Sequence, residues 1–111
     1  MIRCENVNIS FDNQPILLNV NLHIKPAEFI SLVGESGVGK TTLLRLIYFD
    51  VFPNSGTVSV AEYSSEKIKK RDIPRLRRKI GVVFQDFKLL DDRNIYDNVA
   101  FALQVTGVKK N

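Results

Sequence analysis

The sequence has a single cysteine, no tryptophan and only one histidine among its 111 residues. One cysteine, Cys4, cannot form a disulfide framework, and this favours a reducing compartment. Cys4 falls in an expected strand, where a buried thiol is commoner than a reactive one. The one histidine, His23, has no Cys, Asp or Glu at ligand spacing, so we expect it on the polar side of a strand rather than in a metal site.

Long hydrophobic runs are also absent. No apolar stretch approaches the ~20 residues that a bilayer-spanning helix needs, and the start, MIRCENVNIS, lacks the apolar core of a signal peptide. We therefore expect a cytoplasmic protein, or one that is peripheral on the cytosolic side of a membrane. The hydrophobic fraction of 44% is enough for the core of one domain, and the net charge of +4 does not by itself indicate nucleic-acid binding.

The strongest feature present is a glycine loop between two apolar segments. Residues 34–41, GESGVGKT, fit G-x-x-x-x-G-K-[ST] at every fixed position. The apolar run 29–33 before the loop predicts a strand buried on both faces, as in a parallel sheet. The segment 42–48 after it has no Gly or Pro and predicts a buried helix. A glycine-rich turn before an ordinary helix is the alternative, but strand, loop and helix in this order favour a nucleotide-binding P-loop.

The spacing of this loop suits the capture of phosphate. Glycines let the backbone wrap an anion with its N–H groups pointing inward, and the start of the helix adds the positive end of its dipole. We expect Lys40 to act as a catalytic cation on the β- and γ-phosphates of ATP, and the Thr41 hydroxyl to ligate Mg²⁺. The predicted nucleotide-binding residues of the loop are Gly34, Glu35, Ser36, Gly37, Val38, Gly39, Lys40, Thr41 and Thr42.

Alternating apolar residues precede the loop. Apolar side chains alternate with polar ones up to Phe11 and again between Leu18 and Ile24, which predicts two half-buried antiparallel strands. The sequence DNQP at 12–15 predicts the turn between them. Phe11 stands just before this turn, where its ring could stack on an adenine or continue the apolar face of the strand. Periodicity alone favours the apolar face.

A basic segment follows the P-loop region. The turn PNSG at 53–56 and a short strand at 57–60 lead into residues 64–79, which carry eight basic side chains against only Glu66 and Asp72. Such a run could contact phosphates of nucleic acid or of lipid head groups, but it lacks the interleaved aromatics of a single-strand binder. A solvated basic face, meeting at most an acidic partner, is the commoner outcome, so nucleic acid is not the expected partner.

A second continuous apolar run, IGVVF at 80–84, predicts a second strand of the parallel sheet. It ends in Gln85, a polar residue at the carboxyl end of a strand, where α/β folds place their ligands. The last helix is expected over 94–105, with Asn94 as its N-cap.

Taken together, an aromatic before a turn, the P-loop, the Pro-x-Ser-Gly turn and IGVVFQ resemble the nucleotide-binding domain of ABC transporters. The resemblance runs along all 111 residues, but only to the N-terminal half of that domain. It implies an α/β P-loop NTPase fold with a mainly parallel core sheet that is incomplete here. The parts implied are an antiparallel β lead-in (1–27), the P-loop strand and helix (28–49), and the Q-loop strand, loop and following helix (80–107).

The resemblance also implies roles for single residues. Phe11 would stack on the adenine of ATP, although tyrosine is more usual in the family, and Gln85 would be the Q-loop glutamine that helps to hold Mg²⁺ and the attacking water. Phe87, Leu89 and Leu90, with Gln85, would line the docking site of an integral membrane subunit. An ATP-dependent homodimer and a location on the inner face of the plasma membrane are implied as well.

The stretch RRKIGVVFQDFKLL at 77–90, followed by Asp92 and Arg93, is most similar to the FtsE subfamily, the cell-division branch that pairs with the membrane protein FtsX. The implied function is an ATPase subunit that couples ATP binding and hydrolysis to an FtsX-type partner. The lipoprotein-release and macrolide-export branches share much of this sequence and stay as alternatives. So does a small-molecule kinase, although it leaves Gln85 unexplained.

The family's signature loop, Walker B carboxylates and switch histidine do not occur in these 111 residues. Hydrolysis needs groups that hold the metal and position the attacking water. We therefore expect the chain alone to be a nucleotide-binding module without turnover.

Overall fold

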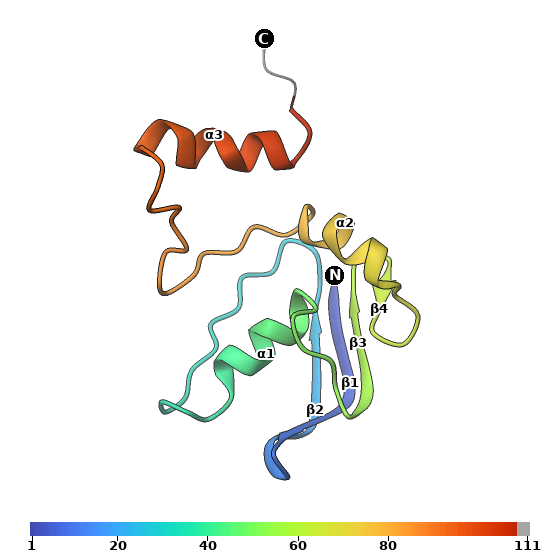
Figure 1. Ribbon diagram of the computed structural model, residues 1–111. Helices are drawn as coiled ribbons and strands as arrows, with labels where there is room; N and C mark the ends of the chain where they lie inside the picture. The colour runs from blue at the N-terminus through green and yellow to red at the C-terminus, as the bar shows by residue number, and fades with distance from the viewer. Residues whose placement is uncertain (109–111) are drawn as a thin grey trace. The chain divides into compact units, whose positions relative to one another are not determined.

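The computed structural model describes residues 1–108. The chain divides into two compact units, the first Met1–Lys79 and the second beginning at Ile80. The first unit holds all the strands of the described chain, together with helices α1 and α2, and the second holds α3 (Figure 1).

The first unit is built on an antiparallel hairpin of β1 (Ile2–Phe11) and β2 (Gln14–Ile24), as predicted. The two residues between these strands, Asp12 and Asn13, both have positive φ, 49° and 62°. Two left-handed residues make the turn whose twist matches that of the flanking strands, and Asp and Asn tolerate this conformation well.

The hairpin extends into a four-stranded sheet of order β2-β1-β3-β4. Strand β3 (Ser55–Val60) pairs antiparallel with the second edge of β1, and the two-residue β4 (Tyr63–Ser64) pairs with β3. The sequence patterns predicted β3 but not β4, since two residues are too few to show a period.

Asparagine side chains supply hydrogen bonds to the backbone of the β1–β2 hairpin at the places where its register shifts. Asn6 and Asn19 have φ of 49° and 48°, outside the strand region. The Asn6 N–H donates to Asn21 Oδ1 at 2.9 Å, and the Asn19 N–H donates to Asn8 Oδ1 at 2.8 Å. These amides replace ladder bonds lost at the irregularities. The slip also turns Leu18 to solvent (68% exposed), although the alternation had predicted it on the apolar face.

The core of the first unit lies where α1 (Lys40–Ile47) packs on the sheet and where η1 (Lys70–Asp72) and α2 (Ile73–Arg77) close one end. Its buried apolar side chains are Cys4, Val7, Ile9, Leu43, Leu46, Phe49, Val58, Val60 and Leu76. Burial raises the pKa of the Cys4 thiol, as a structural cysteine requires. Helix α1 is amphipathic rather than wholly buried, since Leu44 is 53% exposed.

The two predicted parallel strands are not formed in residues 1–108. Neither 29–33 nor 80–84 has strand structure, and Phe29 and Val83 are 92% and 99% exposed. A strand buried on both faces needs hydrogen-bonded neighbours at its edges and other elements on its faces. None of the four described strands pairs with either run, and the described sheet is wholly antiparallel.

The second unit is organised by α3 (Ile95–Val105), whose N-cap is Asn94, as predicted: Asn94 Oδ1 accepts from the Asp97 N–H at 2.8 Å. Gly107, just after the C-cap Thr106, has φ of 88°, and its N–H donates to Gln104 O at 3.1 Å. No side chain of α3 is buried. Within residues 1–108, no helix has the length and apolar character needed to span a bilayer.

Candidate nucleotide-binding site

Residues 34–39 form an exposed loop that leads into α1. Gly37 and Gly39 have positive φ, 81° and 104°. A Cβ at Gly39 would lie 2.9 Å from Leu17 Cδ2 and 3.3 Å from Ile16 O, so both the backbone conformation and the approach of β2 exclude a side chain there. The end of the loop therefore lies close to the start of β2.

The backbone amides of this loop can receive an anion. Among residues 35–39 of the described chain, Val38 is the one whose N–H donates to another residue, to Glu35 O at 3.4 Å. A Cβ at Gly37 would have no atom within 4 Å, so the space beside it is open. Helix α1 starts at Lys40 without a side-chain cap on its first turn. Unpaired amides and the positive end of the helix dipole together suit a phosphate.

The Lys40 ammonium is turned onto the loop itself. Its Nζ donates to the carbonyl oxygens of Gly34 and Glu35. These bonds place the positive charge inside the loop and hold its two ends together. A phosphate is a stronger acceptor for an ammonium than a neutral carbonyl, so the same side chain can transfer to an arriving nucleotide.

The residues present fit a magnesium ion that is carried mainly by its nucleotide. The Thr41 side chain is exposed beside the loop. No group of three or more His, Cys, Asp or Glu side chains in residues 1–108 could hold a metal by itself. Mg²⁺ commonly takes one or two protein ligands and completes its shell with phosphate oxygens and water, so one hydroxyl at the loop is adequate.

Phe11 ends β1 with its side chain 39% exposed, whereas Val7 and Ile9 on the same strand are 0% and 1% exposed. The prediction from periodicity, that Phe11 lies in the core, is therefore wrong. The ring is accessible, as stacking on a base would require.

The remaining predicted site residues lie in the second unit. Gln85 is exposed and follows a run without strand structure, so it does not stand at the carboxyl end of a strand as predicted. Phe87 and Leu89 are 78% and 64% exposed, and Leu90 is half-buried. The predicted apolar docking residues are thus accessible at two of three positions.

The sequence profile of the ABC transporter family matches residues 17–111. The chain belongs to this family. It is 44% identical over 108 residues to the cell division ATP-binding protein FtsE of Streptococcus pneumoniae D39, a match that covers 96% of this chain and 47% of the relative. The FtsE protein of Escherichia coli K12 is 42% identical over 108 residues, with 96% and 49% covered. The predicted similarity to FtsE proteins is confirmed.

Solved structures agree with this ABC assignment. The dimeric ATP-binding cassette MJ0796, in a post-hydrolysis state bound to ADP and Pi, superposes with a TM-score of 0.87 at 32% identity. The match covers 100% of this chain and 50% of that chain. The P-loop NTPase fold of ABC cassettes is thereby confirmed, and the chain spans about half the length of the curated relatives it matches.

The sequence patterns did not predict the structural roles of two further residues of this ABC chain, Asn98 and Arg77. In the second unit, Asn98 of α3 ties down the loop of the predicted docking residues. Its Oδ1 accepts from the Leu90 N–H at 2.8 Å, and its Nδ2 donates to Leu90 O and Arg93 O at 3.1 and 3.2 Å. A second asparagine one helical turn after the N-cap Asn94 was the available signal.

In the first unit, Arg77 closes the end of the P-loop helix. Its Nε donates to Tyr48 O at 3.0 Å and its Nη2 to Phe49 O at 3.1 Å. Helix α1 ends there through the left-handed Phe49 (φ 54°), while the Asp50 N–H returns to Arg45 O at 2.9 Å. The basic segment was predicted to be a solvated face, but Arg77 is a cap that fastens it to α1.

Proposed function

We propose that this chain binds MgATP as part of an ABC ATPase subunit of the FtsE, cell-division type. The observation that carries the proposal is the glycine loop at 34–39, with its unpaired amides ending on the uncapped start of α1. The identity of 42–44% to FtsE proteins supports the cell-division branch.

In this proposal the loop amides from Gly34 onward hold the ATP phosphates, and Lys40 moves from the carbonyls of the loop to the β- and γ-phosphates. Thr41 and Gln85 hold Mg²⁺, which neutralises charge on the phosphates. The exposed ring of Phe11 stacks on the adenine. Gln85 also orients the attacking water, so it is the catalytic residue that we propose alongside Lys40.

The proposed partner is an integral membrane subunit of FtsX type, docked on Gln85, Phe87, Leu89 and Leu90. The exposure of Phe87 and Leu89 supports such a contact, because neighbouring apolar side chains left in water commonly mark an interaction site. The setting would be the inner face of the plasma membrane, with two subunits closing around ATP. The likeness to a dimeric cassette supports that dimer.

The substitution Lys40→Ala tests the binding site. Loss of the ammonium removes a charge-assisted contact to the phosphates, so we expect MgATP affinity to fall by about tenfold or more, measured by calorimetry. Lys25→Ala, at an exposed lysine outside the loop, is the matched control and should leave affinity unchanged. Equal affinity of Lys40→Ala and the parent, with both folded by circular dichroism, would refute the P-loop assignment.

A further inference from the structure

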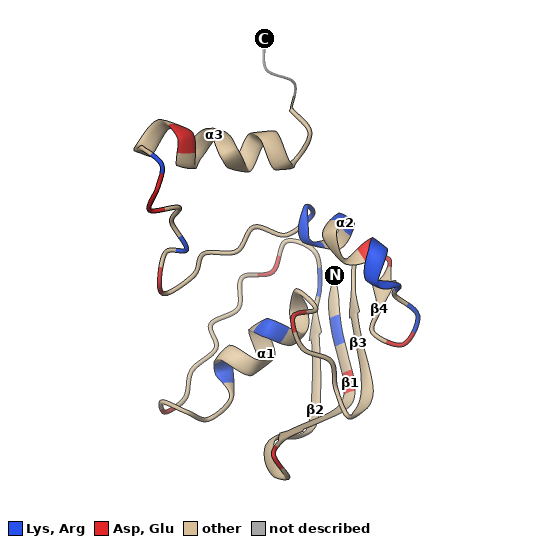
Figure 2. Ribbon diagram, in the orientation of Figure 1, with Lys and Arg blue, Asp and Glu red and all other residues tan. Residues whose placement is uncertain are grey.

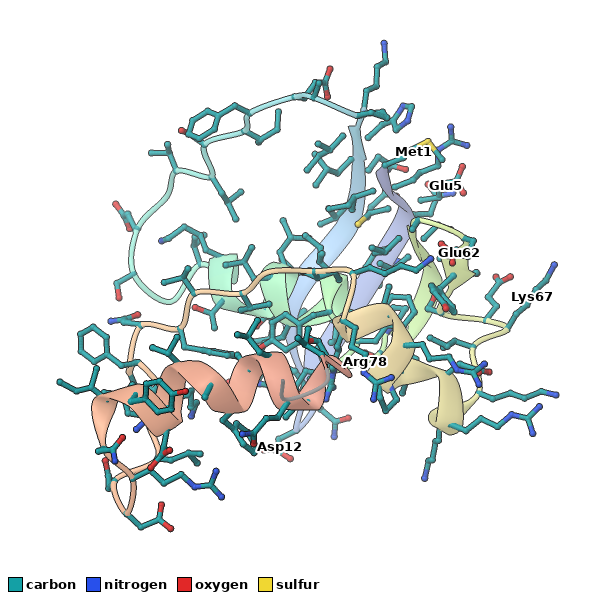
Figure 3. The ribbon with its side chains drawn as sticks, turned by 90° about the horizontal axis from the view of Figure 1, so that it is seen from above. Met1, Glu5, Asp12, Glu62, Lys67 and Arg78 are labelled. Atoms are coloured by element: carbon teal, nitrogen blue, oxygen red, sulfur yellow. The ribbon has the colours of Figure 1, made fainter. Side chains whose placement is uncertain are left out.

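Five cations of the first unit form a patch that the proposed nucleotide and docking sites do not use. We call it the basic face: the exposed side chains of Lys67, Lys69, Lys70, Arg71 and Arg78. They belong to the loop after β4, to η1 and to the end of α2, where the Lys and Arg segments gather in Figure 2. Lys67 extends outward from its loop (Figure 3).

The acidic residues of this region do not neutralise the basic face. Asp72 pairs with Arg75 at 3.4 Å, and Glu62 pairs with Lys79. That hydrogen bond holds the pKa of Glu62 below its usual range. Glu66 accepts from the Thr57 hydroxyl at 2.7 Å. The basic face therefore presents its positive charge to solvent without a carboxylate partner in residues 1–108.

The backbone beneath the basic face is fixed. Leu76 on α2 is fully buried, and the two isoleucines that flank η1, Ile68 and Ile73, are half-buried. These side chains anchor α2 and the two ends of η1. Arg77 adds its two bonds to the end of α1. An anchored array of cations loses little backbone entropy when it meets a partner, which favours binding.

We infer that the basic face binds an anionic lipid surface. A membrane surface with acidic head groups attracts clusters of four to eight Lys and Arg held close to it, and the basic face has five. Single-stranded nucleic acid would need aromatic platforms between the cations. The ring of Tyr63, on β4 before the loop of the basic face, is half-buried, and Lys79 Nζ lies 5.6 Å from its centroid. The choice of lipid rests on the membrane setting of the proposed function, but the inferred contact requires neither ATP nor the membrane subunit.

Flotation of the purified chain with vesicles tests the inference. We expect the chain to float with vesicles of equal parts phosphatidylglycerol and phosphatidylcholine, and not with phosphatidylcholine alone, while aggregated protein sinks. Each lysine or arginine near an anionic surface is worth about a fivefold change in partitioning. The double variant K70Q/R71Q should therefore bind roughly 25-fold more weakly.

The matched control is R3Q/K25Q, which also removes two positive charges from a chain of net charge +4, but outside the basic face. It should keep most of the vesicle binding. An equal loss of vesicle binding in both double variants would overturn the inference, because net charge alone would then explain the binding. Absence of flotation with the anionic vesicles, or tighter binding of the parent to duplex DNA or RNA at the same salt, would overturn it too. We also expect K70Q/R71Q to keep the MgATP affinity of the parent while it loses flotation. This result would show that the basic face acts independently of the nucleotide site.

Discussion

Arginine 77 shows how much of the first unit depends on one side chain whose sequence context suggested only a solvated charge. Helix ends leave backbone carbonyls that need partners from elsewhere. The carbonyls of Tyr48 and Phe49, which follow directly after the last residue of α1, both accept from this guanidinium. Its neighbour Asp50 lies 3.8 Å from the same Nη2 and 2.7 Å from Arg45 Nε. Arg77 thus connects the charged pair of Arg45 and Asp50 with the backbone that follows the end of α1.

Replacement of this residue should therefore destabilise the first unit. Arg77→Ala removes two hydrogen bonds from a charged donor that is about half exposed, and we expect a loss of roughly 1–2 kcal/mol in the free energy of unfolding, measured with urea. The control is the next residue: Arg78→Ala, an exposed arginine of the basic face, should stay within about 0.5 kcal/mol of the parent. Similar losses for both variants would mean that general charge, rather than the cap, sets the stability.

The secondary-structure elements that the sequence predicts well are those whose signals are local. The turn at 12–15 and the N-cap at Asn94 depend on residues within a few positions of one another, and both are observed. The P-loop is recognisable for the same reason. The apolar runs 29–33 and 80–84 carried an equally clear local signal, but a buried strand also needs neighbours from elsewhere, which local patterns do not reveal.

The details of the site divide in the same way. The motif located the phosphate loop, yet nothing local indicated that Lys40 rests on the carbonyls of Gly34 and Glu35. Likewise, periodicity placed Phe11 in the core because it assumes an unbroken strand, whereas the register of β1 with β2 shifts before the strand ends.

Glycine 56 is the residue on which the pairing of β1 with β3 depends most sharply. It has φ of 80°, and a Cβ there would lie 2.2 Å from Asn6 O and 2.5 Å from Glu5 O, in the backbone of β1. Since backbone atoms cannot rotate away, we expect Gly56→Ala to cost roughly 3 kcal/mol or more, from strain and overlap together. Urea unfolding measures it. Gly81→Ala, where a Cβ meets nothing within 4 Å, is the control, and equal stability of both variants would exclude this close approach.

At the scale of the whole molecule, the two units differ in what holds them. Every buried side chain of residues 1–108 belongs to the first unit, and none to residues 80–108. Helix α3 has 11 residues and is held by its caps, by the hydrogen bonds of Asn98 and by the Arg93 guanidinium, which lies 5.0 Å from the Phe101 ring centroid. Helices shorter than about 12–15 residues are marginal in water without tertiary packing.

Amide hydrogen exchange should resolve this difference. We expect the amides of α3 to exchange almost as fast as in an unfolded peptide, because opening this helix exposes no buried surface. The amides of β1, between two paired strands over a core, should exchange only when the first unit unfolds. Peptide-level mass spectrometry of the parent chain measures both in one experiment. Equal protection of α3 and β1 would show that another surface covers α3 in solution, and dilution of the sample would tell whether that surface belongs to a second copy.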